Sequence, residues 1–176
     1  CNSACPAGEN IQAGLAHAQS GNYFEAFQPL VEDNPFPAVM GRFCLKPCET
    51  GSNRNHIDDT VNIHAVERYI GDEAIKQKWP VQFVVNSTEK KVLVVGAGPG
   101  GLSAAYHLAR MGHTVEVYDA GGHPGGLLWT GVPDYRLPKE ILDAEIDRIV
   151  KMGVKIRLHY KVQDVLTEKQ AGNFDA

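Results

Sequence analysis

The stretch Lys91-Val92-Leu93-Val94-Val95-Gly96-Ala97-Gly98-Pro99-Gly100-Gly101 decides the fold of this chain. Its first half is an apolar, mostly β-branched run, typical of a strand buried on both faces of a parallel sheet. A G-x-G-x-x-G pattern follows at once and opens a helix expected over residues 102–111. Gly96 permits a tight turn, Gly98 lets a diphosphate approach the backbone, and Gly101 lets the helix pack on the strand. The stretch therefore predicts a Rossmann-like dinucleotide-binding unit, with the diphosphate on the helix amides.

An acidic residue completes this fingerprint. A second strand is expected over residues 114–118, and Asp119 follows it, about 20 positions after the glycines, where a carboxylate accepts hydrogen bonds from ribose hydroxyls. The alternative is a glycine-rich turn that binds nothing. The strand, the helix and the acidic residue all occur at the spacing of the fingerprint, which argues against this alternative. The fingerprint alone does not separate flavin from nicotinamide. The negative charge of Asp119 disfavours a 2′-phosphate and so argues against NADP at this site.

A second glycine cluster, residues 121–126, follows Asp119 almost directly. Its composition fits either a flexible loop or a backbone that passes close to a bulky ligand. Beyond it, the sequence predicts a helix over residues 139–152 and a strand over residues 154–159, as in a parallel α/β sheet.

The first half of the chain is predicted to be all-α. Apolar stripes at helical spacing lie at residues 11–18, 24–31 and 63–70. Between the second and third stripes, Asn34-Pro35-Phe36-Pro37 is expected to break the helix and start an extended connection to Cys44.

These patterns give an α/β protein of two domains. A helical, cysteine-containing domain of iron-sulfur type is expected over residues 1–85. The first part of a Rossmann-like, FAD-binding parallel-sheet domain is expected over residues 86–176, incomplete at its C-terminus. Residues 81–90 read as the linker.

Composition limits the partners. Hydrophobic residues make up 43% and charged residues 22% of the chain, as in soluble globular proteins. The formal net charge of −4 provides no basic stripe for nucleic acid. No run approaches the ~20 apolar residues of a membrane span, and no secretory leader is visible. We expect a cytoplasmic protein, with further sequence before Cys1 and after Ala176.

The four cysteines form two pairs of equal spacing, Cys1-x3-Cys5 and Cys44-x3-Cys48. In a reducing compartment such pairs more often hold metal or do redox chemistry than form structural disulfides. The residues alone leave a four-cysteine zinc site and an iron-sulfur site about equally open. A third alternative is a helical segment without metal that serves as a docking surface for a partner subunit.

Several blocks together resemble the small (β) subunit of bacterial glutamate synthase and the related NAD(P)H-dependent iron-sulfur flavoproteins. The resemblance covers nearly the whole chain. It rests on the fingerprint stretch and four further blocks: Cys1-x3-Cys5-Pro6, Asn34-Pro35-Phe36-Pro37, Gly41-Arg42-x-Cys44-x3-Cys48-Glu49, and Gly125-Gly126-Leu127-Leu128 through Gly131-x-Pro133-x-x-Arg136-Leu137-Pro138.

The resemblance implies FAD at the fingerprint and a nicotinamide site elsewhere. The adenosine diphosphate part of FAD would lie on one set of residues: Gly96, Gly98, Pro99, Gly100, Gly101 and Asp119. Gly125, Gly126, Leu127 and Arg136 would approach the rest of the flavin. No second fingerprint occurs in these residues, so NAD(P)H is expected to bind outside this segment.

The resemblance also implies that Cys1, Cys5, Cys44 and Cys48 are ligands of a 4Fe-4S cluster. The chain departs from the family at Ser52, where a further cysteine ligand is usual. The resemblance therefore implies one cluster, and a second cluster would need an unusual ligand such as Ser52 or Glu67.

The resulting hypothesis is an electron-transfer part of an NAD(P)H-dependent flavoprotein oxidoreductase. Electrons would pass between nicotinamide, FAD and iron-sulfur clusters to a protein acceptor subunit. No catalytic acid or base is nominated. The alternative is a non-catalytic FAD- or ADP-binding assembly module with a structural zinc or no metal.

Overall fold

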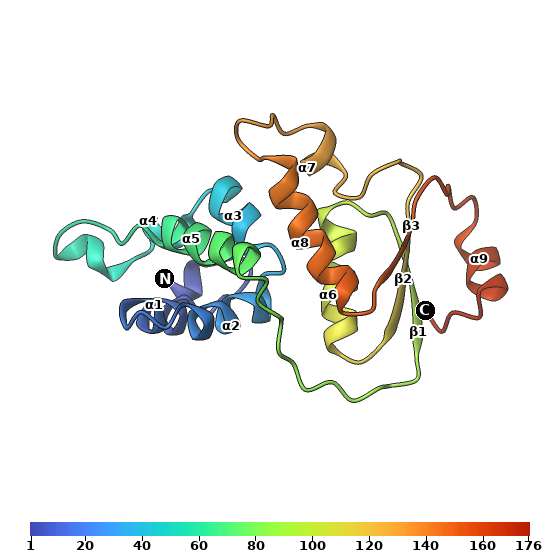
Figure 1. Cartoon of the computed structure of the whole chain (residues 1–176), viewed down its shortest axis with the longest axis horizontal. Coiled ribbons are helices and arrows are strands. Elements are labelled where there is room, and N and C mark those ends of the chain that lie inside the picture. Colours follow the sequence, from blue (N-terminus) through green and yellow to red (C-terminus); the bar gives the residue numbers. More distant parts are fainter. The chain divides into compact units, whose positions relative to one another are not determined.

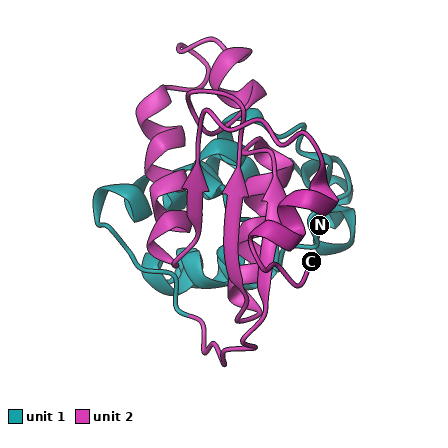
Figure 2. Ribbon diagram, turned by 90° about the vertical axis from the view of Figure 1, so that its right-hand side faces the viewer, with its two compact units in different colours: residues 1–82 teal, residues 83–176 magenta.

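The computed structural model describes all 176 residues and divides into two compact units, residues 1–82 and 83–176 (Figures 1 and 2). The second unit begins slightly before the boundary expected after residue 85. Phe83 explains the difference, because its ring packs on Tyr106 at 6.2 Å and beneath the guanidinium of Arg110 at 4.3 Å.

The first unit is helical throughout, as predicted. Its elements, in chain order, are η1 (Asn2–Ala4), α1 (Ile11–Gln19), α2 (Tyr23–Asp33), α3 (Pro37–Phe43), α4 (Pro47–Thr50), η2 (Asn53–His56) and α5 (Ile63–Lys76). The three predicted stripes correspond to α1, α2 and α5. Their apolar faces form a core in which Phe27, Val31, Val39 and Ile70 are almost fully buried.

The expectation of an extended connection after Asn34 was wrong. Residues Pro37–Phe43 form α3, with Pro37 at its first position. Proline is tolerated there because the first helical N–H has no partner within the helix, and its fixed φ suits the helix. Pro47 begins α4 in the same way.

The second unit is a three-stranded parallel sheet of order β1-β2-β3. Its elements are β1 (Lys91–Val95), α6 (Pro99–Arg110), β2 (Thr114–Tyr118), α7 (Leu127–Thr130), α8 (Lys139–Lys151), β3 (Lys155–Arg157) and α9 (Val165–Ala171). Figure 1 shows α6 and α8 on one side of the sheet and α9 on the other. The predicted α/β parallel sheet is therefore confirmed.

Two details of this unit differ from the prediction. Helix α6 begins at Pro99, inside the glycine pattern, and β3 is shorter than the run expected over 154–159. The chain's last residues pair with β1, since the Asp175 nitrogen donates to the Lys91 oxygen (2.8 Å) and the Leu93 nitrogen donates to the Ala176 oxygen (2.9 Å).

No helix of the structure combines the length and the apolar character needed to cross a bilayer. The segment 77–90 between the last helix of the first unit and β1 contains neither helix nor strand.

Candidate functional site

The fingerprint residues form a tight turn between β1 and α6. Gly96 has a φ of +101°, and its nitrogen donates to the Tyr118 oxygen (2.7 Å) across the strand ends. A Cβ on Gly101 would lie 1.8 Å from the Gly96 oxygen. Only glycine therefore fits at Gly101, which confirms the close packing of helix on turn that the spacing predicts.

The space above the turn is open. A Cβ on Gly98 or on Gly100 would meet no atom within 4 Å, although both lie in the fingerprint. Helix α6 begins here without a side-chain cap, with Gly98 as its N-cap residue. Uncapped amides at a helix start attract an anion, so the turn has the shape and polarity that a diphosphate requires.

The second glycine cluster packs directly on the first. The Gly125 nitrogen donates to the Ala97 oxygen (2.7 Å). A Cβ on Gly126, whose φ is +53°, would lie 2.8 Å from the Gly98 Cα. Gly125 and Gly126 are therefore packed on the fingerprint turn, and their approach to a bulky ligand stays a prediction.

Asp119 lies at the end of β2, where the sequence places it. Its Oδ2 accepts a hydrogen bond from the Ala97 nitrogen and its Oδ1 accepts one from the Gly121 nitrogen, both at 2.6 Å. The carboxylate is thus already bonded to two backbone amides. The sequence did not predict this pairing, because Ala97 and Gly121 carry no distinctive side chain.

Leu127 and Arg136 follow the second glycine cluster in the sequence. Leu127 is the first residue of α7 and is 77% exposed. Arg136 is also exposed, and its backbone nitrogen donates to the Pro133 oxygen at 2.9 Å. Their approach to a flavin stays a prediction.

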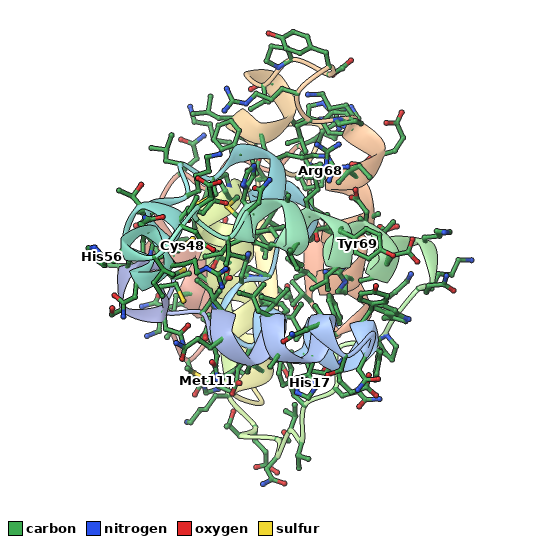
Figure 3. All side chains as sticks on the ribbon, turned by 90° about the vertical axis from the view of Figure 1, so that its left-hand side faces the viewer. His17, Cys48, His56, Arg68, Tyr69 and Met111 are labelled. Carbon is green, nitrogen blue, oxygen red and sulfur yellow. The ribbon has the colours of Figure 1, made fainter.

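The two cysteine pairs come together in the first unit. All four thiols are free, and Cys48 is buried against Ile11 and Ile63. Cys1 and Cys5 pack against the same apolar cluster, because η1 lies against α4. Figure 3 labels Cys48 among the helices of this unit.

Burial and nearby negative charge both disfavour ionisation of the Cys44 and Cys48 thiols. Burial raises the pKa of Cys48, and charge on Cys44 and Cys5 raises it further. Burial likewise raises the pKa of Cys44, which is also affected by charge on Glu67 and Cys5, while the Lys46 amide lowers it. That amide donates to the Cys44 Sγ at 3.2 Å. The raised pKa values favour the neutral thiols in the metal-free chain. The sulfur donors of both pairs nevertheless lie near one another, and thiolate sulfur is the donor type that an iron-sulfur cluster uses.

Glu67 lies beside this group and is held by Asn34. The Asn34 Nδ2 donates to the Glu67 Oε1 (2.7 Å), and the Asn34 Oδ1 accepts from the Phe36 nitrogen (2.9 Å). Burial raises the pKa of Glu9 to about 7, against the lowering effect of its hydrogen bond with Asn34. Asn34 was missed as a site residue, although it opens the Asn34-Pro35-Phe36-Pro37 block.

Ser52 has a structural partner of its own. Its Oγ accepts a hydrogen bond from the Arg54 nitrogen (3.3 Å) and thereby caps η2. No three His, Cys, Asp or Glu side chains in the structure converge as ligands of one metal ion.

Comparisons with known proteins match both units. Residues 1–79 match the family described as dihydropyrimidine dehydrogenase domain II, 4Fe-4S cluster. Residues 94–148 match the NAD(P)-binding Rossmann-like domain. The chain thus combines a helical unit of iron-sulfur type with a Rossmann-like unit. This combination is that of iron-sulfur proteins that bind a nucleotide.

The relatives narrow this class. The chain is 36% identical to the NADPH-Fe(3+) oxidoreductase subunit beta of Geobacter sulfurreducens, over 100% of the chain and 27% of the relative. It is 36% identical to the NAD-dependent dihydropyrimidine dehydrogenase subunit PreT of Escherichia coli, over 97% and 42%. It is 35% identical to the glutamate synthase [NADPH] small chain of Mycobacterium tuberculosis, over 100% and 36%.

The chain belongs to the family of NAD(P)H-dependent iron-sulfur flavoproteins that includes the glutamate synthase small chain. It spans less than half of the length of the relatives described above. Among solved structures, the 6-hydroxypseudooxynicotine amine oxidase of Pseudomonas geniculata matches 51% of this chain and 14% of its own, at 30% identity and a TM-score of 0.36.

Proposed function

We propose that this chain is the FAD-binding, iron-sulfur electron-transfer part of an NAD(P)H-dependent oxidoreductase. The observation that carries the proposal is the presence, in one chain, of two features. Free cysteines from both pairs pack at one apolar cluster, and an open glycine turn is bordered by a second glycine loop. Relatives named as NADPH- or NAD-dependent subunits support the same assignment.

In the second unit, the chain's role is to bind and orient FAD. The open space at Gly98 and Gly100 receives the diphosphate, and Asp119 lies where the ribose hydroxyls would be. Gly125 and Gly126 hold the neighbouring backbone close to the ligand. FAD, when bound, accepts two electrons and releases them one at a time.

In the first unit, Cys1, Cys5, Cys44 and Cys48 would hold a 4Fe-4S cluster through their thiolates. A zinc ion needs its four donors around one point, at about 2.3 Å for sulfur. The match of residues 1–79 to a 4Fe-4S family favours the cluster over zinc. The apolar packing around Cys48 limits access of water to this centre.

The partners follow from what these residues hold. The nicotinamide donor binds outside this segment, because the one fingerprint here is assigned to FAD. Relatives are named as subunits of larger enzymes, so we infer a protein electron acceptor for this chain. No residue is assigned as a catalytic acid or base, since electron transfer between the two centres requires none.

The test is reconstitution of the full chain with iron, sulfide and FAD under anaerobic conditions. The proposal expects stoichiometric flavin, about four iron atoms per cluster, and broad brown absorption beneath the flavin bands that dithionite bleaches. A chain that binds zinc alone would exclude the electron relay. A folded chain that refuses both FAD and iron would leave only a structural assembly module. In a longer protein with the nicotinamide site, failure of both NADH and NADPH to bleach the flavin would exclude the enzyme.

A further inference from the structure

The backbone of Asp119 is fixed on both sides. Its nitrogen donates to the Arg157 oxygen (2.9 Å), and its oxygen accepts from the Tyr160 nitrogen (2.8 Å). Asp119 therefore continues the pairing of β2 with the chain that leaves β3. With a single methylene between backbone and carboxylate, the carboxylate has little freedom to move.

Each carboxylate oxygen of Asp119 accepts an amide from a different loop. Oδ2 takes the Ala97 nitrogen of the fingerprint, and Oδ1 takes the Gly121 nitrogen of the second glycine cluster. Hydrogen bonds to an ionised acceptor are roughly twice as strong as neutral ones. One side chain thus joins two glycine-rich loops that are separated by β2 and α6 in the sequence.

The same two loops meet again at Ala97. Its nitrogen is held by Asp119, and its oxygen accepts from the Gly125 nitrogen at 2.7 Å. Ala97 is buried, and Gly126 lies against Gly98. The open face of the turn is thereby bordered by backbone that is already bonded to other backbone.

We propose that Asp119 is a positioning residue that fastens the fingerprint turn to the second glycine loop before the nucleotide binds. The role of this fastening in binding rests on the proposed function. Glycine loses more conformational freedom on ordering than any other residue, so loops of this composition bind a ligand weakly unless they are ordered beforehand. An ionised carboxylate has about four acceptor sites, so two amides leave room for a ribose hydroxyl.

The first test measures amide hydrogen exchange at Ala97 and Gly121 in the nucleotide-free full chain. Asp119→Asn keeps the shape but turns an amide NH2 group towards an N–H donor, and Asp119→Ala removes both acceptors. In Asp119→Ala we expect exchange at both amides to accelerate roughly ten-fold or more, and in Asp119→Asn at the one amide that faces the NH2 group. Unchanged exchange would overturn the proposal.

Two controls separate a local effect from general loosening. Asp147→Asn makes the same carboxylate-to-amide change at an exposed position of α8, and it should leave exchange at Ala97 and Gly121 unchanged. The Val117 amide in β2 serves as an internal reference. Acceleration confined to Ala97 and Gly121 supports the fastening, whereas equal acceleration at Val117 contradicts it.

The second test separates fastening from a direct bond to ribose. ADP and 2′,3′-dideoxy-ADP are titrated into the wild-type chain and Asp119→Asn. If Asp119 only accepts hydrogen bonds from ribose hydroxyls, Asp119→Asn should weaken the binding of ADP and leave the binding of 2′,3′-dideoxy-ADP unchanged. If Asp119 orders the loops, the substitution should lower the affinity for both ligands by a similar factor, roughly ten-fold.

The outcomes also distinguish this proposal from the proposed function. If the wild-type chain binds neither FAD nor ADP while Asp119→Ala accelerates exchange at Ala97 and Gly121, the fastening stands and the proposed function fails. If FAD binds tightly and exchange is insensitive to the substitution, the function stands and the fastening fails.

Discussion

Gly71 on α5 lies so close to Ala38 on α3 that a Cβ on Gly71 would stand 2.4 Å from the Ala38 backbone nitrogen. The contact is reciprocal, since a Cβ on Gly41 of α3 would stand 2.5 Å from the backbone of Arg68 on α5. Two helices therefore touch backbone to backbone. Because α3 leads directly into Cys44, this contact fixes where the second cysteine pair begins.

Gly71→Ala should destabilise the first unit by roughly 2 kcal/mol, because the added methyl must push the backbone of α3 away. The gain in helix propensity from glycine to alanine, about 1 kcal/mol, is smaller than this penalty. Urea unfolding followed by circular dichroism measures the difference.

Gly14→Ala in α1 is the matched control. It adds the same methyl within a helix of the same unit, but the nearest atom is the flexible end of Leu30 at 3.3 Å. We expect the free energy of unfolding to stay the same or to rise by up to about 1 kcal/mol, because the gain in helix propensity meets only a flexible side chain. Equal effects of the two substitutions would contradict the assigned contact between α3 and α5.

The fingerprint glycines should divide into a structural and a binding class. Gly101→Ala places a methyl 1.8 Å from the Gly96 oxygen and should lower the Tm of the second unit. Gly98→Ala meets no atom within 4 Å and has an ordinary φ of −75°, so the fold should tolerate it. Its methyl would occupy the space of the diphosphate, and FAD affinity should fall roughly ten-fold or more.

Thermal unfolding and FAD fluorescence titration measure the two effects separately. Gly153→Ala is unsuitable as a neutral reference, because its φ of +99° strains any other residue. Ser103→Ala in α6 changes no glycine and serves instead. An unchanged FAD affinity in Gly98→Ala would place the diphosphate elsewhere.

The sequence predicted the fold where local pattern and tertiary role agree. The strand before Gly96, the acid after β2 and the helix ended by Gly153 were all found, since their spacing is dictated by the parallel βαβ geometry. The prediction of an extended connection failed at Pro37, because a proline that ends one helix can also stand at the first position of the next. Helices α7 and α9 were not predicted, because helices this short carry too few turns for a periodic pattern.

The candidate site was predictable only in its side chains and glycines. Gly96, Gly98 and Gly101 show their constraints in the residue type itself. Ala97 does not, because its contribution is made by its backbone nitrogen and oxygen. Asn34 depends on a partner, Glu67, that lies 33 positions away in the sequence, so its hydrogen bond needed the fold to be seen.

Substitution of the cysteines tests the cluster assignment. Cys48→Ser should lower iron and sulfide per chain by more than half, because a hydroxyl is a poor substitute for thiolate in an iron-sulfur cluster. Ser52→Ala is the control, since the Ser52 hydroxyl caps η2 and its loss should leave the iron content unchanged. Loss of iron in Ser52→Ala would make Ser52 a ligand.

The ion pair between Lys91 and Glu116 should make the second unit less stable in acid. Burial alone would raise the pKa of Glu116, but hydrogen bonds from Lys91 and Tyr118 outweigh it and lower the pKa below its ordinary value of 4.5. A lowered pKa in the folded state means that the stabilisation is complete above that ordinary value and is lost as the pH falls through the folded-state value.

Glu116→Gln should therefore cost about 1 kcal/mol at pH 7, because the Lys91 Nζ lies 3.0 Å from the Glu116 Oε1 and both side chains are partly shielded from water. The cost should shrink as the pH falls below the ordinary value of 4.5 and through the lowered folded-state value, because the wild-type carboxylate then becomes protonated. Urea unfolding at several pH values measures it, with Asp147→Asn as the exposed control. A difference between wild type and Glu116→Gln that stays constant with pH would show that Glu116 stabilises by packing and not by charge.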